Sequence, residues 1–146
     1  MVMTVMTITA QTALKKVYNE NIDPMEQIDK ALVNAKAEGK YVVCQVGGNW
    51  CPWCLRFADF AEKNQAVNYN PRKAGGEEAA KKAAKLMQRL DNPARFGFPV
   101  FVVLDANGKV LHTQDSSFLE EEKSYSEKKV LRFFNNWTPS AVENKK

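Results

Sequence analysis

Two cysteines separated by two residues stand in the first half of the chain. Cys51 and Cys54 flank Pro52 and Trp53 and directly follow Trp50. Three residues of separation place both side chains on one face of a single helical turn, where their sulfurs can form a disulfide and open it again. The spacing therefore indicates thiol-disulfide chemistry.

The position of Cys51 favours a reactive thiolate. If a helix begins here, this sulfur lies beside unpaired backbone N–H groups and the positive end of the helix dipole. The thiolate is the nucleophile in disulfide exchange, so the placement suits redox chemistry. Pro52 agrees with a helix start, because proline is favoured at the first helical position, where its missing N–H costs nothing.

A third cysteine, Cys44, lies within the apolar run 41–46 (YVVCQV). We expect it to be a small buried hydrophobic residue of a central strand. The alternative is a third thiol that exchanges with the pair, which would need an exposure that such a strand does not favour. Three cysteines cannot all pair, so Cys51 and Cys54 form the expected couple.

Zinc binding is the main chemical alternative for this cysteine spacing. A structural zinc site needs four ligands, and the further candidates are Cys44 and His112, the single histidine. His112 is far away in sequence and lies in a β-like run, so we expect no metal and no other cofactor. Nothing marks His112 as a base for Cys51 either, which argues against a cysteine-protease pair.

Length and composition favour one globular domain. The chain has 146 residues, 45% of them hydrophobic and 26% charged, which is enough to bury a core without a second domain. The net charge of +4 comes from 21 basic and 17 acidic residues that are mostly interleaved, so we expect no nucleic-acid interface. No apolar run reaches the roughly 18 residues of a membrane helix, so we expect no stable membrane insertion.

The first ten residues differ from the rest of the chain. Residues 1–10 (MVMTVMTITA) carry no charge and end on a small residue, and the sequence becomes polar at Gln11. This pattern is typical of the end of a secretory signal whose basic start is missing, which would make the protein periplasmic or otherwise exported. The alternative is an edge strand or terminus of a cytoplasmic protein. We expect one domain over 11–138 and a flexible tail at 139–146.

Helices and strands alternate along the sequence. Asp23, Pro24 and Glu26 form a helix start that resembles a capping box, and Gly39 is a stop, which predicts a helix over 24–38. The run 41–46 is then a strand covered on both faces, and a helix follows from Cys51 to about residue 64. Further expected elements are a weak strand at 66–69, a helix at 77–90, strands at 100–104 and 110–113 joined by an Asn107-Gly108 turn, a loop at 114–124 and a helix at 126–137.

The last predicted helix has a clear hydrophobic pattern. Its cap is Ser126, and its core-facing residues are expected to be Val130, Leu131, Phe134 and Trp137. Together with the buried strand at 41–46, these helices predict an α/β protein.

The order of the elements and three motifs resemble the thioredoxin superfamily. The motifs are WCPWC at 50–54 after a strand, GFP at 97–99 before a strand, and the hairpin VVLDANGK at 102–109. The resemblance covers about residues 24–138 and implies a thioredoxin fold, with a central mixed β-sheet flanked by helices. Residues 48–54 and 111–115 are also similar to small secreted thioredoxin-like proteins and to the C-terminal domain of membrane thiol-electron transporters.

The resemblance implies a role for each residue of the cysteine motif. Cys51 and Cys54 would be the catalytic thiols. Trp50, Pro52 and Trp53 would support them, and the two tryptophan rings would belong to an apolar rim around the sulfurs.

The Gly-Phe-Pro motif would complete the site. By the resemblance, Pro99 is a cis-proline packed beside the cysteines, a rare bond that usually marks a shaped site. Phe98 would present backbone N–H and C=O groups to an extended substrate strand, with Gly97 next to it, and the Phe98 ring would join the apolar rim.

Gln45 departs from the family pattern. Many thioredoxins carry a buried acid six residues before the first cysteine, which accepts the proton of the second thiol, and Gln45 occupies that position here. An amide can orient a water molecule but cannot take the proton. The deprotonation of Cys54 would therefore have to use solvent or another group.

The implied function is that of a thiol-disulfide oxidoreductase. Cys51 would form a mixed disulfide with a partner protein, and Cys54 would resolve it. The partners would be protein thiols and disulfides with an upstream thiol electron donor, and we expect a monomer. Similarity to reducing transporter domains favours a reductase or isomerase over an oxidant. The alternative is a peptide-binding module that keeps the cysteines as a static disulfide.

Overall fold

The computed structural model describes residues 16–61, 67–69 and 76–144. A four-stranded sheet in the order β2-β1-β3-β4 lies at its centre. The strands are β1 (Val42–Gly47), β2 (Val67–Asn68), β3 (Val100–Leu104) and β4 (Val110–Asp115). β1 is parallel to β2 and antiparallel to β3, which is antiparallel to β4, so the mixed sheet is confirmed. The weak strand expected at 66–69 is present as β2.

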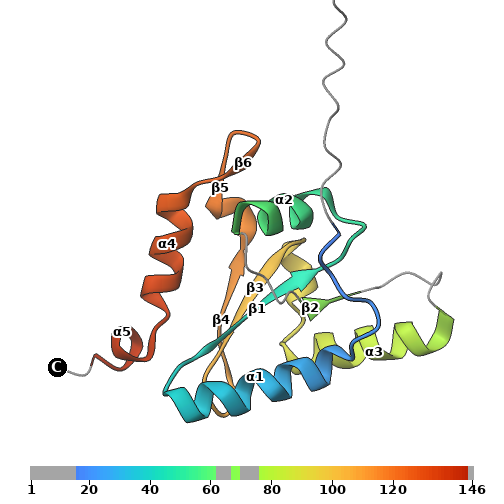
Figure 1. The fold of residues 1–146 in the computed structure, drawn as a ribbon, viewed down its shortest axis with the longest axis horizontal. Helices are drawn as coiled ribbons and strands as arrows, with labels where there is room; N and C mark the ends of the chain where they lie inside the picture. The colour runs from blue at the N-terminus through green and yellow to red at the C-terminus, as the bar shows by residue number, and fades with distance from the viewer. Residues whose placement is uncertain (1–15, 62–66, 70–75, 145–146) are drawn as a thin grey trace, which may run out of the picture.

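Helices cover both faces of this sheet (Figure 1). α1 (Pro24–Glu38) and α3 (Gly76–Arg89) pack on one face, and α2 (Pro52–Ala61) and α4 (Glu127–Asn136) pack on the other. The sheet therefore separates two hydrophobic cores.

The central strand β3 shows how one sequence supplies both cores. Val100, Val102 and Leu104 pack with α1 and α3, whereas Phe101 and Val103 pack with α2 and α4. Successive residues of a strand point to opposite faces, and none of these five is more than 1% exposed. Burial on both faces accounts for the unbroken apolar run in the sequence.

Local signals start and end α1, and form the turn between β3 and β4, at the positions that the sequence predicts. The side chain of Asp23 caps α1 at its start, and Gly39 ends it with a φ of 65°, a left-handed conformation that glycine adopts at little cost. Between β3 and β4, the Asp105 carboxylate accepts hydrogen bonds from the N–H groups of Asn107 and Lys109. These bonds hold the predicted hairpin.

The prediction of a loop at 114–124 is wrong. β4 extends to Asp115, which caps a short 3-10 helix, η3 (Ser116–Leu119), and a hairpin of β5 (Glu120–Glu121) and β6 (Ser124–Tyr125) follows. Leu119 and Tyr125 are buried in the core shared by α2 and α4. These two apolar anchors order a segment whose composition is otherwise polar.

The predicted inward face of α4 is wrong at two positions. Val130 and Phe133 are each 5% exposed, whereas Leu131 is 52% and Phe134 38% exposed. Trp137 is partly buried against the same core. Val130, Phe133 and Trp137 form a helical stripe as regular as the predicted one, and packing on the sheet decides between the two.

The C-terminal end contains a helix where the sequence predicts a tail. α5 (Pro139–Glu143) is capped by Thr138, and none of its residues is buried. Residues 1–10, the predicted end of α2 at 62–64, and residues 145–146 lie outside the described residues. Within the described ranges, every helix is too short or too polar to cross a bilayer.

Candidate active site

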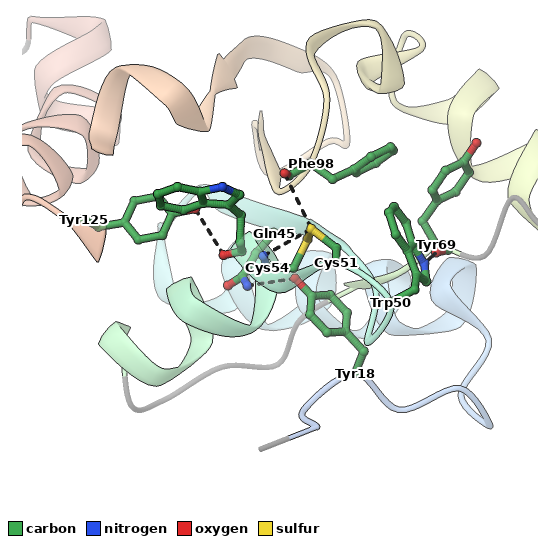
Figure 2. Close-up of a disulfide and its surroundings, with 9 residues drawn as sticks. Tyr18, Gln45, Trp50, Cys51, Cys54, Tyr69, Phe98 and Tyr125 are labelled. Atoms are coloured by element: carbon green, nitrogen blue, oxygen red, sulfur yellow. Dashed lines mark hydrogen bonds between the residues drawn. A yellow bond between two sulfur atoms is a disulfide. The ribbon is translucent and has the colours of Figure 1, made fainter. Parts of the chain in front are cut away.

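Cys51 and Cys54 form a disulfide at the start of α2 (Figure 2). Their Cα atoms are 5.2 Å apart. α2 begins at Pro52, which is exposed, and the Cys51 carbonyl accepts a hydrogen bond of 3.2 Å from the N–H of Leu55. Cys51 therefore occupies the position immediately before the helix.

The N-terminus of α2 points at the Cys51 sulfur. The N–H of Cys54 donates a hydrogen bond to Cys51 Sγ over 3.2 Å. The first N–H groups of a helix carry partial positive charge, so they would stabilise a negative charge on this sulfur once the disulfide is reduced. Cys51 is 6% exposed and Cys54 is fully buried, so Cys51 is the more exposed residue of the pair.

A second loop meets the disulfide from the start of β3. The carbonyl oxygen of Phe98 lies 3.6 Å from Cys51 Sγ. Pro99 is buried, and the Phe98–Pro99 peptide bond is cis. Gly97 ends the 3-10 helix η2 (Pro93–Phe96) with a φ of 79°, which favours glycine, and is exposed. The structure thus brings Phe98 of the Gly-Phe-Pro motif into contact with Cys51, with Gly97 and Pro99 on either side of it in the chain.

Trp50, Tyr69 and Phe98 form an aromatic cluster on one side of the disulfide (Figure 2). The Phe98 ring stacks on Tyr69 with centroids 5.0 Å apart and meets Trp50 edge-on at 5.4 Å. The indole N–H of Trp50 donates to the carbonyl of Tyr69 over 3.0 Å. All three side chains are only partly buried, so they form an apolar surface next to Cys51.

Trp53 is held on the other side of the disulfide. Its carbonyl accepts a 3.2 Å hydrogen bond from the Tyr125 hydroxyl, and the two rings meet edge-on at 5.7 Å. The guanidinium carbon of Arg56 lies 4.7 Å from the Trp53 ring centre, a cation–π geometry. Burial, helped by the Glu120 carboxylate, raises the pKa of Tyr125, so its hydroxyl keeps its proton. In Figure 2, Tyr125 and Trp50 lie on opposite sides of the disulfide.

Gln45 is buried in β1 and is 5% exposed. Its Nε2 donates a hydrogen bond to the hydroxyl oxygen of Tyr18 over 2.9 Å, and its Oε1 has no hydrogen-bond partner among the described residues. Tyr18 packs with both cysteines. Burial raises the pKa of Tyr18, and the hydrogen bond from Gln45 acts in the opposite direction.

Cys44 and His112 lie apart from this site. Cys44 is 2% exposed in the core under α1 and α3, as expected, and burial raises its pKa to about 12 although Arg89 opposes the shift. His112 lies on β4 and stacks on Trp137 at 4.4 Å. Across the described ranges, no three His, Cys, Asp or Glu side chains are grouped to hold a metal ion.

Sequence reasoning missed three tyrosines of the site, Tyr18, Tyr69 and Tyr125. Tyr18 precedes α1 in a stretch without periodicity, where the only signal is the apolar pair with Val17. Tyr69 follows a two-residue strand. Tyr125 lies in β6, between the loop that the sequence predicts at 114–124 and the helix that it predicts at 126–137. Tyr18 reaches the cysteines, Tyr69 reaches Trp50 and Phe98, and Tyr125 reaches Trp53, in each case through tertiary packing that spacing alone does not reveal.

The chain is similar to one protein family and to two solved structures. Residues 28–124 match the family model described as a thioredoxin-like domain. Among solved structures, the disulphide isomerase from Xylella fastidiosa Temecula1 is 26% identical, with a TM-score of 0.63 over 85% of this chain and 98% of its own. A DsbH oxidoreductase is 19% identical, with a TM-score of 0.48 over 99% of this chain and 96% of its own. No curated protein matches the chain.

Proposed function

The chain belongs to the thioredoxin-like domain family, and we propose that it is a thiol-disulfide oxidoreductase that acts through Cys51 and Cys54. The observation that carries the proposal is the Cys51–Cys54 disulfide at the N-terminus of α2, with the Phe98 carbonyl beside it. The similarity to a disulphide isomerase supports the same class of chemistry.

In the proposed reaction, the thiolate of Cys51 attacks one sulfur of a substrate disulfide. A mixed disulfide forms, and the other substrate sulfur leaves as a thiolate and takes up a proton. The N–H of Cys54 and the helix N-terminus stabilise the attacking thiolate. Cys54 then attacks Cys51, which closes the disulfide seen here and releases the reduced substrate.

Gly97 and Phe98 are the proposed binding residues for an extended substrate segment. The Phe98 backbone lies against Cys51, so a segment paired with it would bring its own sulfur to the reactive thiol. Trp50 and Tyr69 extend the apolar surface on this side, which favours substrates with apolar residues next to the cysteine. Pro99 supports the loop that carries these groups.

We favour a reductase or isomerase over an oxidant. The 26% identity to the Xylella fastidiosa disulphide isomerase supports this direction. The proposed partners are protein thiols and disulfides, with an upstream thiol donor that regenerates the dithiol. Monomeric state stays a prediction, and so does export, because residues 1–10 lie outside the described residues.

Cys54→Ser tests the proposed function by trapping substrates. Without the second thiol, the mixed disulfide at Cys51 cannot be resolved, so we expect covalent complexes that dithiothreitol releases on gels. Cys51→Ser is the matched control and should trap nothing. A Cys54→Ser protein whose Cys51 is alkylated readily, yet which traps no partner from lysates or exported-protein fractions, would contradict the proposal.

A peptide-binding module with a static disulfide is the second candidate function. Low exposure of the disulfide favours it, since Cys51 is only 6% exposed. In this case the aromatic surface would hold an extended peptide, and the disulfide would only stabilise the start of α2. Reversible reduction of the folded chain would contradict this candidate.

A further inference from the structure

The hydroxyl of Tyr18 points toward the disulfide (Figure 2). Tyr18 belongs to the segment before α1, is 4% exposed and packs with Cys51 and Cys54. Its backbone is bound to the Asn49 side chain, because its N–H donates to Oδ1 over 3.1 Å and its carbonyl accepts from Nδ2 over 2.8 Å. The ring is therefore fixed from both its backbone and its surroundings.

Gly47 allows the Tyr18 hydroxyl and the Cys54 sulfur to be neighbours. A Cβ atom added at Gly47 would lie 2.5 Å from Cys54 Sγ and 2.7 Å from the Tyr18 hydroxyl oxygen. Cys54 Sγ and the Tyr18 hydroxyl oxygen thus border the same small space. The distance between these two atoms is at most the sum of their distances from the added Cβ. A side chain at position 47 would be too close to both atoms, so the local structure would have to shift.

The hydrogen bond from Gln45 leaves the hydroxyl hydrogen of Tyr18 available. Because Gln45 Nε2 donates to the hydroxyl oxygen over 2.9 Å, that oxygen acts as the acceptor and its own hydrogen can be given elsewhere. Cys54 Sγ is the reactive atom next to it. The Gln45 amide is therefore bonded to the Tyr18 hydroxyl, and that hydroxyl lies beside the Cys54 sulfur.

We propose that Tyr18 donates a hydrogen bond to the thiolate of Cys54, and that Gln45 is a positioning residue that acts through Tyr18. This inference rests on the proposed oxidoreductase function. Tyr18 would do for the second thiol what the N-terminus of α2 does for the first.

This arrangement differs in its physics from an acid at position 45. A carboxylate could take the proton of Cys54, but its charge would oppose that of the thiolate. A neutral phenol cannot take the proton, but a hydrogen bond to the thiolate favours the charged form and lowers the pKa of the thiol. Burial raises the pKa of Tyr18 itself, so the phenol keeps its hydrogen and stays a donor.

The resolving step balances without a base at position 45. Cys54 loses its proton to solvent, and its sulfur attacks Cys51 Sγ. The bond between Cys51 and the substrate sulfur breaks as the Cys51–Cys54 bond forms. The substrate sulfur leaves with the electron pair and takes up one proton, so it is reduced while the chain is oxidised. Tyr18 keeps its hydroxyl proton throughout this step.

The groups around Tyr18 and Cys54 determine how the rate of the resolving step depends on pH. Cys51 lies at the start of α2, and β1 contributes Gln45, which does not titrate. Tyr18 affects the pKa of Tyr125 in β6 electrostatically, and so do Glu120 and Arg56. Burial raises the pKa of Tyr125 as well, so both tyrosines stay neutral near pH 7. The pH dependence of the second step should therefore report Cys54.

Stopped-flow reaction of the reduced chain with 5,5′-dithiobis(2-nitrobenzoate) separates the two thiols. Release of the first thionitrobenzoate reports Cys51 and depends on reagent concentration, whereas the second release reports Cys54 and does not. For Tyr18→Phe we expect an unchanged first step and a pH midpoint of the second step about one unit higher. The second step should be about three- to tenfold slower at pH 7, because a more basic thiolate partly offsets its lower population.

Two further variants make the test specific. Tyr41→Phe removes the hydroxyl of a tyrosine that packs in the core of α2 and α4, and should leave both steps unchanged. A 3,5-difluorotyrosine at position 18 is a stronger donor of nearly the same size, and it should lower the second midpoint even if Tyr18→Phe does not fold.

The possible outcomes separate this inference from the function on which it rests. An unchanged second step in Tyr18→Phe, or equal slowing of both steps, would overturn the role of Tyr18. An unchanged midpoint with difluorotyrosine at position 18 would do the same. A folded, reduced wild-type chain that never releases the first thionitrobenzoate would instead contradict the oxidoreductase function.

Discussion

Cys51 and Cys54 have different surroundings although only two residues separate them. The sulfur of Cys51 accepts a hydrogen bond from the N–H of Cys54. It lies next to the Phe98 carbonyl, at the edge of an aromatic surface. Cys54 is fully buried and borders the Tyr18 hydroxyl. This asymmetry suits one thiol that meets the substrate and a second thiol that resolves the intermediate.

Gln45 shows what residue-level sequence reasoning can and cannot supply. Position 45 follows from counting back from Cys51, so its departure from the family pattern is visible in the sequence. Its partner is not, because Tyr18 lies 27 residues earlier and reaches it only through the fold. The residue that can assist Cys54 is therefore found only in three dimensions.

Cys44→Ala should make folding less sensitive to alkaline pH. The Cys44 thiol has an ordinary pKa of 9.0 when exposed and of about 12 in the folded chain. Between these values the unfolded chain loses this proton and the folded chain retains it, so the free energy of unfolding falls as pH rises. One such group contributes at most about 1.4 kcal/mol per pH unit.

Guanidinium unfolding of the oxidised chain at pH 8, 9, 10 and 11 measures this effect. Tyr18 and Tyr125 contribute with the same sign, but they are present in both proteins and cancel in the comparison. The wild type should lose more stability above pH 9 than Cys44→Ala does. Parallel pH profiles for the two proteins would contradict the burial argument.

For helices and strands, local signals were sufficient to predict a start, a stop or a turn where a single residue controls the backbone conformation. Asp23, Gly39 and the Asn107-Gly108 turn each act on their own neighbours, so their effect can be read from the sequence. The inward face of α4 could not be read in this way. Phe133 and Phe134 fit the helical period almost equally, and the choice depends on the shape of the sheet surface below.

Phe133→Ala and Phe134→Ala should differ in their effect on stability. Phe133 is buried and packs on Phe101 at 5.8 Å, so its loss leaves a cavity and should cost about 3–5 kcal/mol. Phe134 is 38% exposed, and its loss should cost less than about 1 kcal/mol. Urea unfolding of the two oxidised variants is the measurement. Equal losses would show that the assigned face of α4 is wrong.

Over the whole molecule, sheet topology assembles the site. β1 and β3 are antiparallel, and Val46 near the end of β1 pairs with Val100 at the start of β3. The cysteines follow the C-terminal end of β1, and the Phe98-Pro99 loop precedes the N-terminal end of β3. Because the two strands are antiparallel, both segments must lie at the same end of the sheet. The resemblance of the motifs to thioredoxins already implies that the cysteines and the Phe98-Pro99 loop lie close together. The match of residues 28–124 to the thioredoxin-like domain family agrees with this.

The reversibility of the Cys51–Cys54 disulfide in the folded chain tests the central claim most directly. The chain is equilibrated in glutathione buffers of increasing reducing strength, quenched with acid and alkylated, while circular dichroism monitors the fold. We predict a reversible two-electron transition in a chain that stays folded, with Cys51 alkylated before Cys54. A disulfide that resists reduction until the chain unfolds would contradict the oxidoreductase function and leave a static peptide-binding module.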